Sequence, residues 1–346
     1  MNTTKRIIID ATAIGLPMCG LYEYARQLCP RLVLNCPENM RFTFIVPKGK
    51  KGCFGDGAEY YEVGEFQIWM LKNLPILKGD LFHAIHQLCR VKRFHGTKIK
   101  LLTIHDINFE HTKTGRSYQH AKKRFLKRLN AATHLAFITK FARQDVALRY
   151  PSFKPSRIIY NGVTAPNLNN SKQPGNVTED KFLFHLSSLE PYKRAELLVE
   201  MMDYLPDKTL VIAGRCRNQA LIQMMAQREN VKYIGEVSDE EKAWLYQHCK
   251  AFLFPSMAEG FGLPPVEAML CGKQTFLAQA TSLPEIGADV AFFWPDLTPE
   301  KMAKFIEEKL GSAINTEKII AHANQFSWDK CANEYINYYQ EILTND

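Results

Sequence analysis

The chain has 346 residues, of which 46% are hydrophobic and 23% are charged, and its formal net charge is +8. This length exceeds that of one small core and predicts two domains, and the composition is typical of a globular protein. No apolar run approaches the roughly 20 residues that a membrane-spanning helix needs. The early apolar run at 7–9 is too short for a signal peptide and indicates a first strand instead.

Nine cysteines are scattered along the chain without a Cys-x-x-Cys pair or the spacing of a metal site. We therefore expect reduced, mostly buried thiols, as in a cytosolic protein, rather than a disulfide framework.

Short apolar runs alternate with helical patterns, which predicts an α/β fold with parallel sheets. A polar stretch at 164–180, containing proline, glycine and asparagine, indicates an interdomain linker. In the first half we expect helices at 22–34 and 121–132, and strands at 6–10, 41–46, 81–84, 100–104, 135–138 and 157–159.

The second half repeats the alternation and ends in a long helical pattern at 329–343. Two doubly wound domains are therefore expected, with ligands bound in a cleft at the carboxyl ends of the strands. The expected strands of this half span 182–186, 209–213, 231–234, 251–254, 274–277 and 291–293.

Much of the positive charge gathers in the segment 111–128. A basic amphipathic helix there could lie on an anionic membrane, where each Lys or Arg contributes about 1 kcal/mol. It could also bind nucleic acid, or be an ordinary solvated helix face. The segment contains Lys113, Arg116, Lys122, Lys123, Arg124, Lys127 and Arg128, together with His111 and His120.

The segment 256–272 carries the most specific chemistry. Two glycines follow Glu259, and two prolines then open a helical pattern that places Glu267 in its first turn. A glycine loop that leads into a helix N-terminus presents backbone N–H groups to an anion such as phosphate. Ionised glutamates accept hydrogen bonds from hydroxyls, and phosphates beside hydroxyls indicate a nucleotide sugar. The plainer alternative is a solvated loop residue and a helix-end charge, each contributing a few tenths of a kcal/mol.

The run from Glu259 to Glu267 resembles the E-x7-E signature of retaining GT-B glycosyltransferases, most closely glycosyltransferase family 4. The resemblance implies that Glu259 lies near the donor sugar and that Glu267 binds the ribose. It also implies that the backbone amides of Phe261, Gly262 and Leu263 meet the diphosphate or the sugar.

The family resemblance extends over nearly the full length and implies a GT-B fold of two Rossmann-like, doubly wound domains facing across a cleft. Residues 1–165 would form the acceptor-side domain and 166–325 the nucleotide-sugar-binding domain. The end of the chain, 326–346, begins with Phe-Ser-Trp, as in family members whose terminal helix crosses back to the first domain.

The segment 182–194 resembles the family stretch that follows the first strand of the second domain. Lys193 stands where the family's lysine neutralises the donor diphosphate, and a cation there helps a phosphate leaving group depart. Arg194 could assist. Many members carry an arginine where this chain has Ser188, whose hydroxyl can still donate a hydrogen bond. Alternatively, Lys193 and Arg194 merely open a surface helix.

Three further positions match the family less closely. His105, followed by Asp106, resembles the family's His-Asp and would line the donor-sugar and acceptor side, although a lone histidine at a strand end is commonly a core residue. Gly20 matches the first glycine of the family's loop beneath the diphosphate, in the segment 15–24, while the side chain of Tyr22 would crowd that loop. Ile234 corresponds to a stretch that meets the nucleobase through its backbone.

The resemblance implies a retaining, metal-independent hexosyltransferase of the mannosyl or glucosyl type. Its donor would be a nucleotide-diphosphate sugar, GDP-mannose or a UDP-hexose, without a further cofactor. The acceptor would be a hydroxyl of a glycan or lipid-linked glycan, as in surface polysaccharide or lipopolysaccharide synthesis. No Asp-x-Asp sequence occurs to hold a metal-bound diphosphate.

With such an acceptor, we expect a cytoplasmic protein that contacts the inner face of the membrane through 111–128 and has no nucleic-acid partner. The alternatives are another GT-B chemistry, such as a nucleotide-sugar epimerase or a phosphorylase, and a non-catalytic basic module that binds sugar or nucleic acid. An epimerase needs no acceptor, and a phosphorylase needs phosphate instead of a nucleotide sugar.

Overall fold

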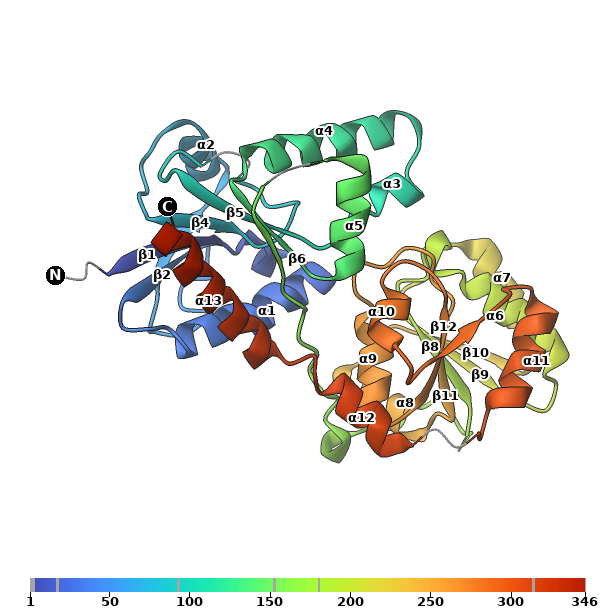
Figure 1. Cartoon of the computed structure of the whole chain (residues 1–346). Coiled ribbons are helices and arrows are strands. Elements are labelled where there is room, and N and C mark those ends of the chain that lie inside the picture. Colours follow the sequence, from blue (N-terminus) through green and yellow to red (C-terminus); the bar gives the residue numbers. More distant parts are fainter. Residues whose placement is uncertain are drawn as a thin grey trace. The chain divides into compact units, whose positions relative to one another are not determined.

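The computed structural model describes residues 4–16, 19–91, 94–151, 154–179, 181–312 and 315–345. The chain forms two compact units, which Figure 1 colours along the sequence. Unit 1 comprises Met1–Gly162 and Phe326–Asp346, and unit 2 comprises Val163–Gln325. Each unit contains one parallel sheet with helices, so the predicted doubly wound α/β architecture is confirmed.

Unit 1 is built on a seven-stranded sheet with the order β3-β2-β1-β4-β5-β6-β7, and its paired strands run parallel. All six predicted strands are present, and β3 is an additional one at the edge. The strands are β1 (Lys5–Asp10), β2 (Met40–Pro47), β3 (Glu59–Val63), β4 (Leu81–Ala84), β5 (Ile99–Ile104), β6 (His134–Phe137) and β7 (Ser156–Ile158).

The helices of unit 1 include two that begin earlier than the apolar periodicity predicted. The helix expected from 22 begins at Gly20, and the one expected from 121 begins at Gly115. The helices are α1 (Gly20–Leu34), α2 (Glu65–Asn73), α3 (Phe109–Thr112), α4 (Gly115–Ala131), α5 (Lys140–Arg149) and α13 (Trp328–Asn345), with a short 3-10 turn, η1 (Thr12–Gly15), after β1.

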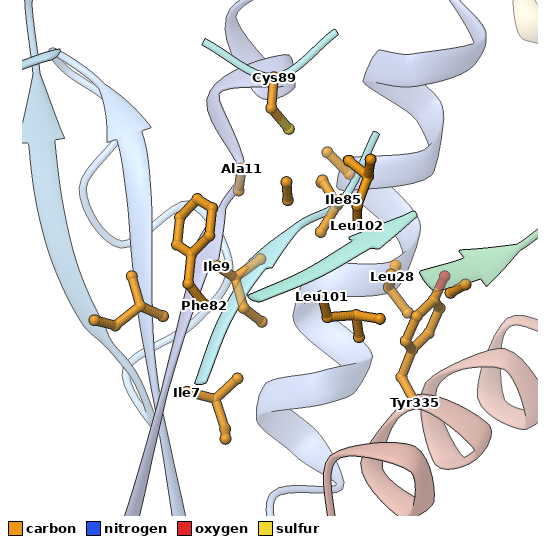
Figure 2. Packing of buried hydrophobic residues seen from close by; sticks show 14 of the residues in the cluster. Ile7, Ile9, Ala11, Leu28, Phe82, Ile85, Cys89, Leu101, Leu102 and Tyr335 are labelled. Carbon is orange, nitrogen blue, oxygen red and sulfur yellow. The ribbon is translucent and has the colours of Figure 1, made fainter. Parts of the chain in front are cut away.

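The core of unit 1 lies between the sheet and its helices (Figure 2). Ile7 and Ile9 of β1 and Leu101 of β5 pack with Leu28 of α1 and Tyr335 of α13, and all five are buried. Burial of each such side chain stabilises the fold by about 1.5–3 kcal/mol. The uninterrupted apolar run Ile7–Ile9 of β1 follows from this arrangement, because a parallel strand covered on both faces has no polar side.

The final helix, α13, is joined to unit 1 by buried hydroxyl groups. The Tyr335 hydroxyl lies 2.8 Å from the hydroxyl oxygens of both Tyr24 and Thr103. The Tyr339 hydroxyl lies 2.7 Å from Nδ1 of His83. Thus a segment more than 200 residues away in sequence completes the first sheet's core.

The start of α13 also meets the chain where unit 1 first ends. A Cβ atom on Gly162 would come within 2.2 Å of the backbone nitrogen of Trp328, so only glycine allows this approach. The rings of Tyr160 and Phe326 add a contact at 5.8 Å between centroids.

Unit 2 contains a six-stranded parallel sheet with the order β10-β9-β8-β11-β12-β13. The six predicted strands are all present, with ends within one residue of those expected. They are β8 (Leu183–Leu186), β9 (Leu210–Ala213), β10 (Val231–Gly235), β11 (Ala251–Phe254), β12 (Gln274–Ala278) and β13 (Phe292–Trp294).

The helices of unit 2 lie mainly between successive strands, as parallel connections require. They are α6 (Ala195–Met201), α7 (Gln219–Ala226), α8 (Asp239–His248), α9 (Leu263–Leu270), α10 (Leu283–Gly287), α11 (Pro299–Lys309) and α12 (Thr316–Ala323), with 3-10 turns η2 (Leu168–Asn170), η3 (Pro191–Lys193) and η4 (Met202–Tyr204). Across the described parts of both units, no helix is long and apolar enough to cross a bilayer.

Candidate active site

The strand order of unit 2 selects one place for a ligand. β8 lies between β9 and β11, so the connection from β8 leaves to one side of the sheet while β11 begins the other side. Ligands of doubly wound sheets bind beyond the carboxyl ends of the strands at such a switch point. Lys193 follows β8 and Glu259 follows β11, so both predicted residues lie at this point.

Lys193 and Glu259 are in direct contact. The Nζ atom of Lys193 lies 2.5 Å from Oε1 of Glu259, and the two side chains are only 13% and 11% exposed. The same ammonium lies over the rings of Tyr192 and Phe254, at 5.0 and 5.3 Å from their centroids. Because water is largely excluded, this pair interacts more strongly than a surface ion pair would.

Backbone hydrogen bonds hold the two loops of this site together. The N–H of Met257 donates to the carbonyl of Tyr192 at 2.9 Å, and the hydroxyl of Ser256 donates to the same oxygen at 3.4 Å. The position of Lys193 is therefore fixed by the loop that carries Glu259.

A buried histidine shapes the loop after β8. Nδ1 of His185 lies 2.8 Å from the carbonyl oxygen of Leu253, which can only accept, so Nδ1 carries the proton. Nε2 then accepts from the hydroxyl of Ser187 at 2.8 Å, and that hydroxyl oxygen accepts from the N–H of Leu189 at 3.1 Å. Burial lowers the pKa of His185 to about 4 and keeps the ring neutral.

The glycine loop after Glu259 is held from the next loop of the sheet. The N–H of Glu259 donates to the hydroxyl of Thr281 at 3.1 Å. The hydroxyl of Ser282 lies within donating distance of the carbonyls of Glu259 and Phe261, at 3.1 and 2.9 Å. Phe261 is buried, and these bonds position the backbone that leads into α9.

Gly262 is the residue that precedes α9, and its φ of +104° is a conformation that side chains rarely adopt. The helix begins at Leu263, and Pro264 occupies its first turn as predicted. The first backbone N–H groups of a helix lack partners within it and attract anions. Phe261, Gly262 and Leu263 thus lie together at a helix N-terminus.

Glu267 lies elsewhere than the proline pattern indicated. Because α9 begins at Leu263, Glu267 falls in its second turn and not in the first. Its Oε1 atom lies 3.1 Å from Nζ of Lys242, and its Oε2 atom accepts from the hydroxyl of Tyr246 at 2.9 Å. Burial, reinforced by Glu267, raises the pKa of Tyr246 well above its usual value, so that the hydroxyl remains a donor.

Lys242 and Tyr246 are functional candidates that sequence reasoning missed. They stand four residues apart on α8, on one face of that helix. Burial alone would lower the pKa of Lys242, but the carboxylates of Glu267 and Asp239 outweigh burial and raise it. Lys242 is therefore a charged ammonium beside the predicted ribose ligand.

The other predicted residues of unit 2 are placed more loosely. Ser188 is exposed in the loop after β8, and Ile234 is half-buried in β10. Arg194, with a φ of +52°, joins the turn at Pro191–Lys193 to α6. Ser188 and Arg194 thus follow β8, and Ile234 lies near the end of β10.

In unit 1, His105 follows β5 and is buried. Its Nε2 atom lies 3.0 Å from the carbonyl oxygen of Ile85, which requires a proton on Nε2. Burial lowers the pKa of His105 to about 4, so the ring is neutral at physiological pH.

Gln87, which the sequence did not single out, holds the peptide of His105 on both sides. Its Oε1 atom accepts from the N–H of His105, and its amide nitrogen donates to the carbonyl of Asp106, both at 3.0 Å. The carboxylate of Asp106 accepts from the N–H of Asn108, and thus orients its own loop.

The segment 15–24 differs from the predicted loop. Gly20 opens α1, so Tyr22 stands in a helical turn, while residues 17 and 18 lie outside the described residues. A Cβ atom on Gly20 would meet nothing within 4 Å, so packing does not require glycine there. Tyr24 is buried and its ring meets His105 edge to face, at 4.5 Å between centroids.

Comparison with known proteins identifies the kind of protein that carries this site. Residues 167–326 match the family model described as glycosyl transferases group 1. The chain is 26% identical to O-antigen chain mannosyltransferase B of Escherichia coli, over 97% of this chain and 99% of that protein. The region 167–326, nearly all of unit 2, is thus a glycosyl transferases group 1 region, and the chain as a whole resembles a mannosyltransferase.

A second relative has a higher sequence identity over a shorter stretch. The glycosyltransferase is 32% identical to serotype-specific mannosyltransferase WbdA of Escherichia coli over 47% of its own length, which corresponds to 22% of the relative. It therefore spans less than a quarter of WbdA.

Solved structures show that the glycosyltransferase has the GT-B fold. Sucrose-phosphate synthase from Thermosynechococcus elongatus has a TM-score of 0.75 at 16% identity, over 99% of this chain and 100% of that one. Anabaena HepE, solved in complex with UDP and glucose, has a TM-score of 0.69 at 17% identity, over 97% and 99% of the two chains.

Proposed function

We propose that this glycosyltransferase moves a hexosyl unit from a nucleotide-diphosphate sugar to a hydroxyl of a glycan or lipid-linked glycan, with retention of the anomeric configuration. The observation that carries the proposal is the Lys193–Glu259 pair at the switch point of unit 2. It supplies a cation for phosphate and a carboxylate for hydroxyls, and the N-terminus of α9 follows Glu259 directly.

Lys193 neutralises the nucleoside diphosphate as it leaves. The bond from C1 of the sugar to the diphosphate oxygen breaks, and a bond from C1 to the acceptor oxygen forms on the same face. The departing phosphate takes the proton of the acceptor hydroxyl, so no protein base is required. Negative charge grows on the leaving oxygen during this step, and fixed positive charge beside it lowers the barrier.

Glu259 binds sugar hydroxyls or the positive charge that develops at C1, with the loop amides of Phe261, Gly262 and Leu263 nearby. His105 is neutral, so one of its ring nitrogens can accept a hydrogen bond from a hydroxyl of the sugar or acceptor. Glu267 holds the ribose from a carboxylate already oriented by Lys242 and Tyr246.

The donor sugar is proposed to be mannosyl or glucosyl, carried by GDP or UDP. The names of the E. coli relatives, both mannosyltransferases, favour mannose, and the same names favour an O-antigen or related surface polysaccharide as the product. The backbone near Ile234 would meet the base.

A lipid-linked acceptor would bring the protein to the inner face of the cytoplasmic membrane, where α4 is proposed to contact anionic lipid. Arg128 does not take part, contrary to the expectation for 111–128, because it is buried and donates to the carbonyl of Cys89. α4 instead exposes a cationic stripe on one face, at i, i+7 and i+11: Arg116, Lys123 and Lys127.

Thermal unfolding of the full chain with GDP, UDP, ADP, dTDP and their sugars, in a metal chelator, tests the donor. The matching nucleotide at a hundredfold excess over Kd should stabilise the protein by about 2.7 kcal/mol. Glu267→Gln keeps the shape of Glu267 but removes its charge, and should weaken donor binding by about tenfold. An unchanged donor affinity would show that Glu267 is not a donor ligand.

The reaction itself is tested by incubating the stabilising sugar nucleotide with lipid-linked glycan. Glycan growth with a retained anomeric configuration supports the proposal. Donor consumption without glycan growth would indicate an epimerase, and activity that depends on inorganic phosphate would indicate a phosphorylase. Either outcome overturns the proposed transfer.

A further inference from the structure

The described surface of unit 1 carries an unusual concentration of exposed apolar side chains. Ten large hydrophobic residues are exposed among the described residues, and five of them fall between 66 and 88. We call these five the apolar patch: Phe66, Trp69, Leu74, Ile76 and Leu88. Single exposed apolar residues need no explanation, but a concentration of them marks an interaction surface.

Two members of the apolar patch lie on the outer face of α2. Phe66 and Trp69 are 66% and 56% exposed, and their rings stack at 6.3 Å between centroids. The opposite face of α2 buries Ile68 and Leu71 in the core. The helix thus has apolar side chains on two faces, and only one of them is covered.

Contacts bring the segments of the apolar patch together. The guanidinium of Arg90, two residues after Leu88, pairs with the carboxylate of Glu65 at the start of α2. Leu74 and Ile76 continue the chain directly after α2. The patch is therefore spread over α2, the segment that follows it and the loop after β4.

Basic residues of α2, of the loop after β4 and of the exposed face of α4 lie near the apolar patch. Arg128 of α4 donates to the carbonyl of Cys89, next to Leu88, so the end of α4 lies against this loop (Figure 1). Lys72 of α2 has a lowered pKa because of burial and of the neighbouring cations Arg90 and Arg128. Further along α4 runs the cationic stripe, and a shallow hollow of about 420 Å³ on this helix is lined by Lys122, Lys123 and Lys127 among others.

We propose that the apolar patch inserts into the interfacial layer of an anionic lipid bilayer, with Phe66 and Trp69 as its anchors. Aromatic side chains favour the boundary between headgroups and acyl chains, and flanking Lys and Arg favour anionic headgroups. The three aliphatic side chains of the apolar patch suit acyl chains better than a sugar. The nearby cations distinguish an anionic bilayer from an apolar protein partner.

The insertion extends the lipid contact of the proposed function. It does not depend on the transfer chemistry, because vesicle binding is measured without donor or acceptor. Loss of vesicle binding with intact nucleotide stabilisation would refute only the insertion. Intact vesicle binding without stabilisation by any nucleotide would refute only the transfer.

Trp69 provides a reporter without a label. The chain has four tryptophans, all within the described residues, and the other three (Trp244, Trp294 and Trp328) are at most 9% exposed. With vesicles of phosphatidylglycerol and phosphatidylcholine, we expect a blue shift of several nanometres in Trp emission and quenching by lipids brominated near the headgroup end of their acyl chains. Vesicles of phosphatidylcholine alone should give at least tenfold weaker binding at physiological salt.

Substitutions distinguish anchoring by the aromatic pair from nonspecific adsorption of the protein to vesicles. The double variant Phe66→Ser/Trp69→Ser should bind anionic vesicles at least tenfold more weakly in a sedimentation assay while keeping the wild-type melting temperature. The matched control is Leu148→Ser on α5, which removes an even more exposed apolar residue (79%) outside the apolar patch and should bind as wild type.

The proposal is overturned if anionic vesicles leave the emission wavelength of Trp69 unchanged. It is equally overturned if the double variant and Leu148→Ser bind anionic vesicles with the same affinity. It is also overturned if soluble glycan alone produces the blue shift, since the aromatic pair would then be a sugar platform. Equal binding of the wild type to charged and uncharged vesicles would remove the role of the nearby cations.

Discussion

Lys193 and Glu259 neutralise one another, and their side chains are largely shielded from water. A diphosphate that entered would bring its own negative charge to the ammonium and allow Glu259 to turn to sugar hydroxyls. The pair therefore compensates the buried charge of each partner and holds both groups ready for the proposed donor.

Lys193→Met removes the cation and leaves Glu259 largely buried without its partner. We expect a loss of about 2 kcal/mol in the free energy of unfolding, because hydrogen bonds to charged groups contribute about that much. Turnover should fall by at least about a hundredfold, since stabilisation of the leaving charge is lost. Chemical denaturation and a transfer assay measure the two effects.

The double variant Lys193→Met/Glu259→Gln is the control for stability. It no longer contains an unpaired buried carboxylate, so it should recover much of the lost stability while turnover stays low. Normal turnover in either variant would contradict the role of Lys193.

At the residue scale, the sequence predicted side chains whose place follows from their own segment. Lys193 and Glu259 come directly after buried strands, so their shared edge of the sheet could be foreseen. Lys242 could not, because it reaches Glu267 from another helix, 25 residues away in the chain. The same applies to Gln87, whose contact with His105 depends on two strands being neighbours.

At the element scale, α13 is held to unit 1 by the Tyr335 hydroxyl, which serves Tyr24 and Thr103 at once. Tyr335→Phe leaves both of those buried hydroxyls with one partner fewer. We expect a loss of about 1–3 kcal/mol in the unfolding free energy of unit 1, and no change in nucleotide binding by unit 2.

Tyr338→Phe is the matched comparison on the same helix. It removes a single, longer hydrogen bond of 3.2 Å to the carbonyl of Leu135 and should cost less than Tyr335→Phe. Equal losses in urea denaturation would show that the shared hydroxyl has no special part in attaching α13.

β3 and the first turns of α4, which the sequence did not predict, share a physical reason. β3 reads Glu-Tyr-Tyr-Glu-Val and lies at the sheet edge, where one side of the strand is solvated and no apolar run is needed. The first turns of α4 are polar and exposed, so they carry no apolar period. The buried central strands, in contrast, are mostly apolar and were predicted closely.

At the scale of the whole molecule, the two units differ in their buried histidines. Burial lowers the pKa of His83 and His86 to about 3 and that of His105 to about 4, all in unit 1. In unit 2, burial lowers the pKa of His185 to about 4. An unfolded histidine has a pKa of about 6.5, so between pH 6.5 and 4 the unfolded chain binds more protons than the folded one.

Stability should therefore fall as the pH falls through this range, and faster in unit 1. Each histidine contributes a slope of about 1.4 kcal/mol per pH unit, so near pH 5.5 we expect about 4 kcal/mol per unit from unit 1 and about 1.4 from unit 2. Calorimetry of the full chain between pH 5 and 7 measures both, with the nucleotide-stabilised transition assigned to unit 2. His83→Gln should remove about a third of the steeper slope, and parallel slopes in the two units would contradict the assignment.

The close approach of Gly162 to Trp328 has a consequence for how such a protein can change over time. The chain leaves unit 1 after Gly162 and returns to it at Phe326, and these two chain segments are neighbours. Unit 2 is therefore a cassette, an insertion in unit 1 whose two ends adjoin. A cassette with adjoining ends can be replaced by a homologous one without reopening the core that receives it. Recombination at this junction would exchange the unit proposed to recognise the nucleotide while keeping the unit proposed to meet the acceptor.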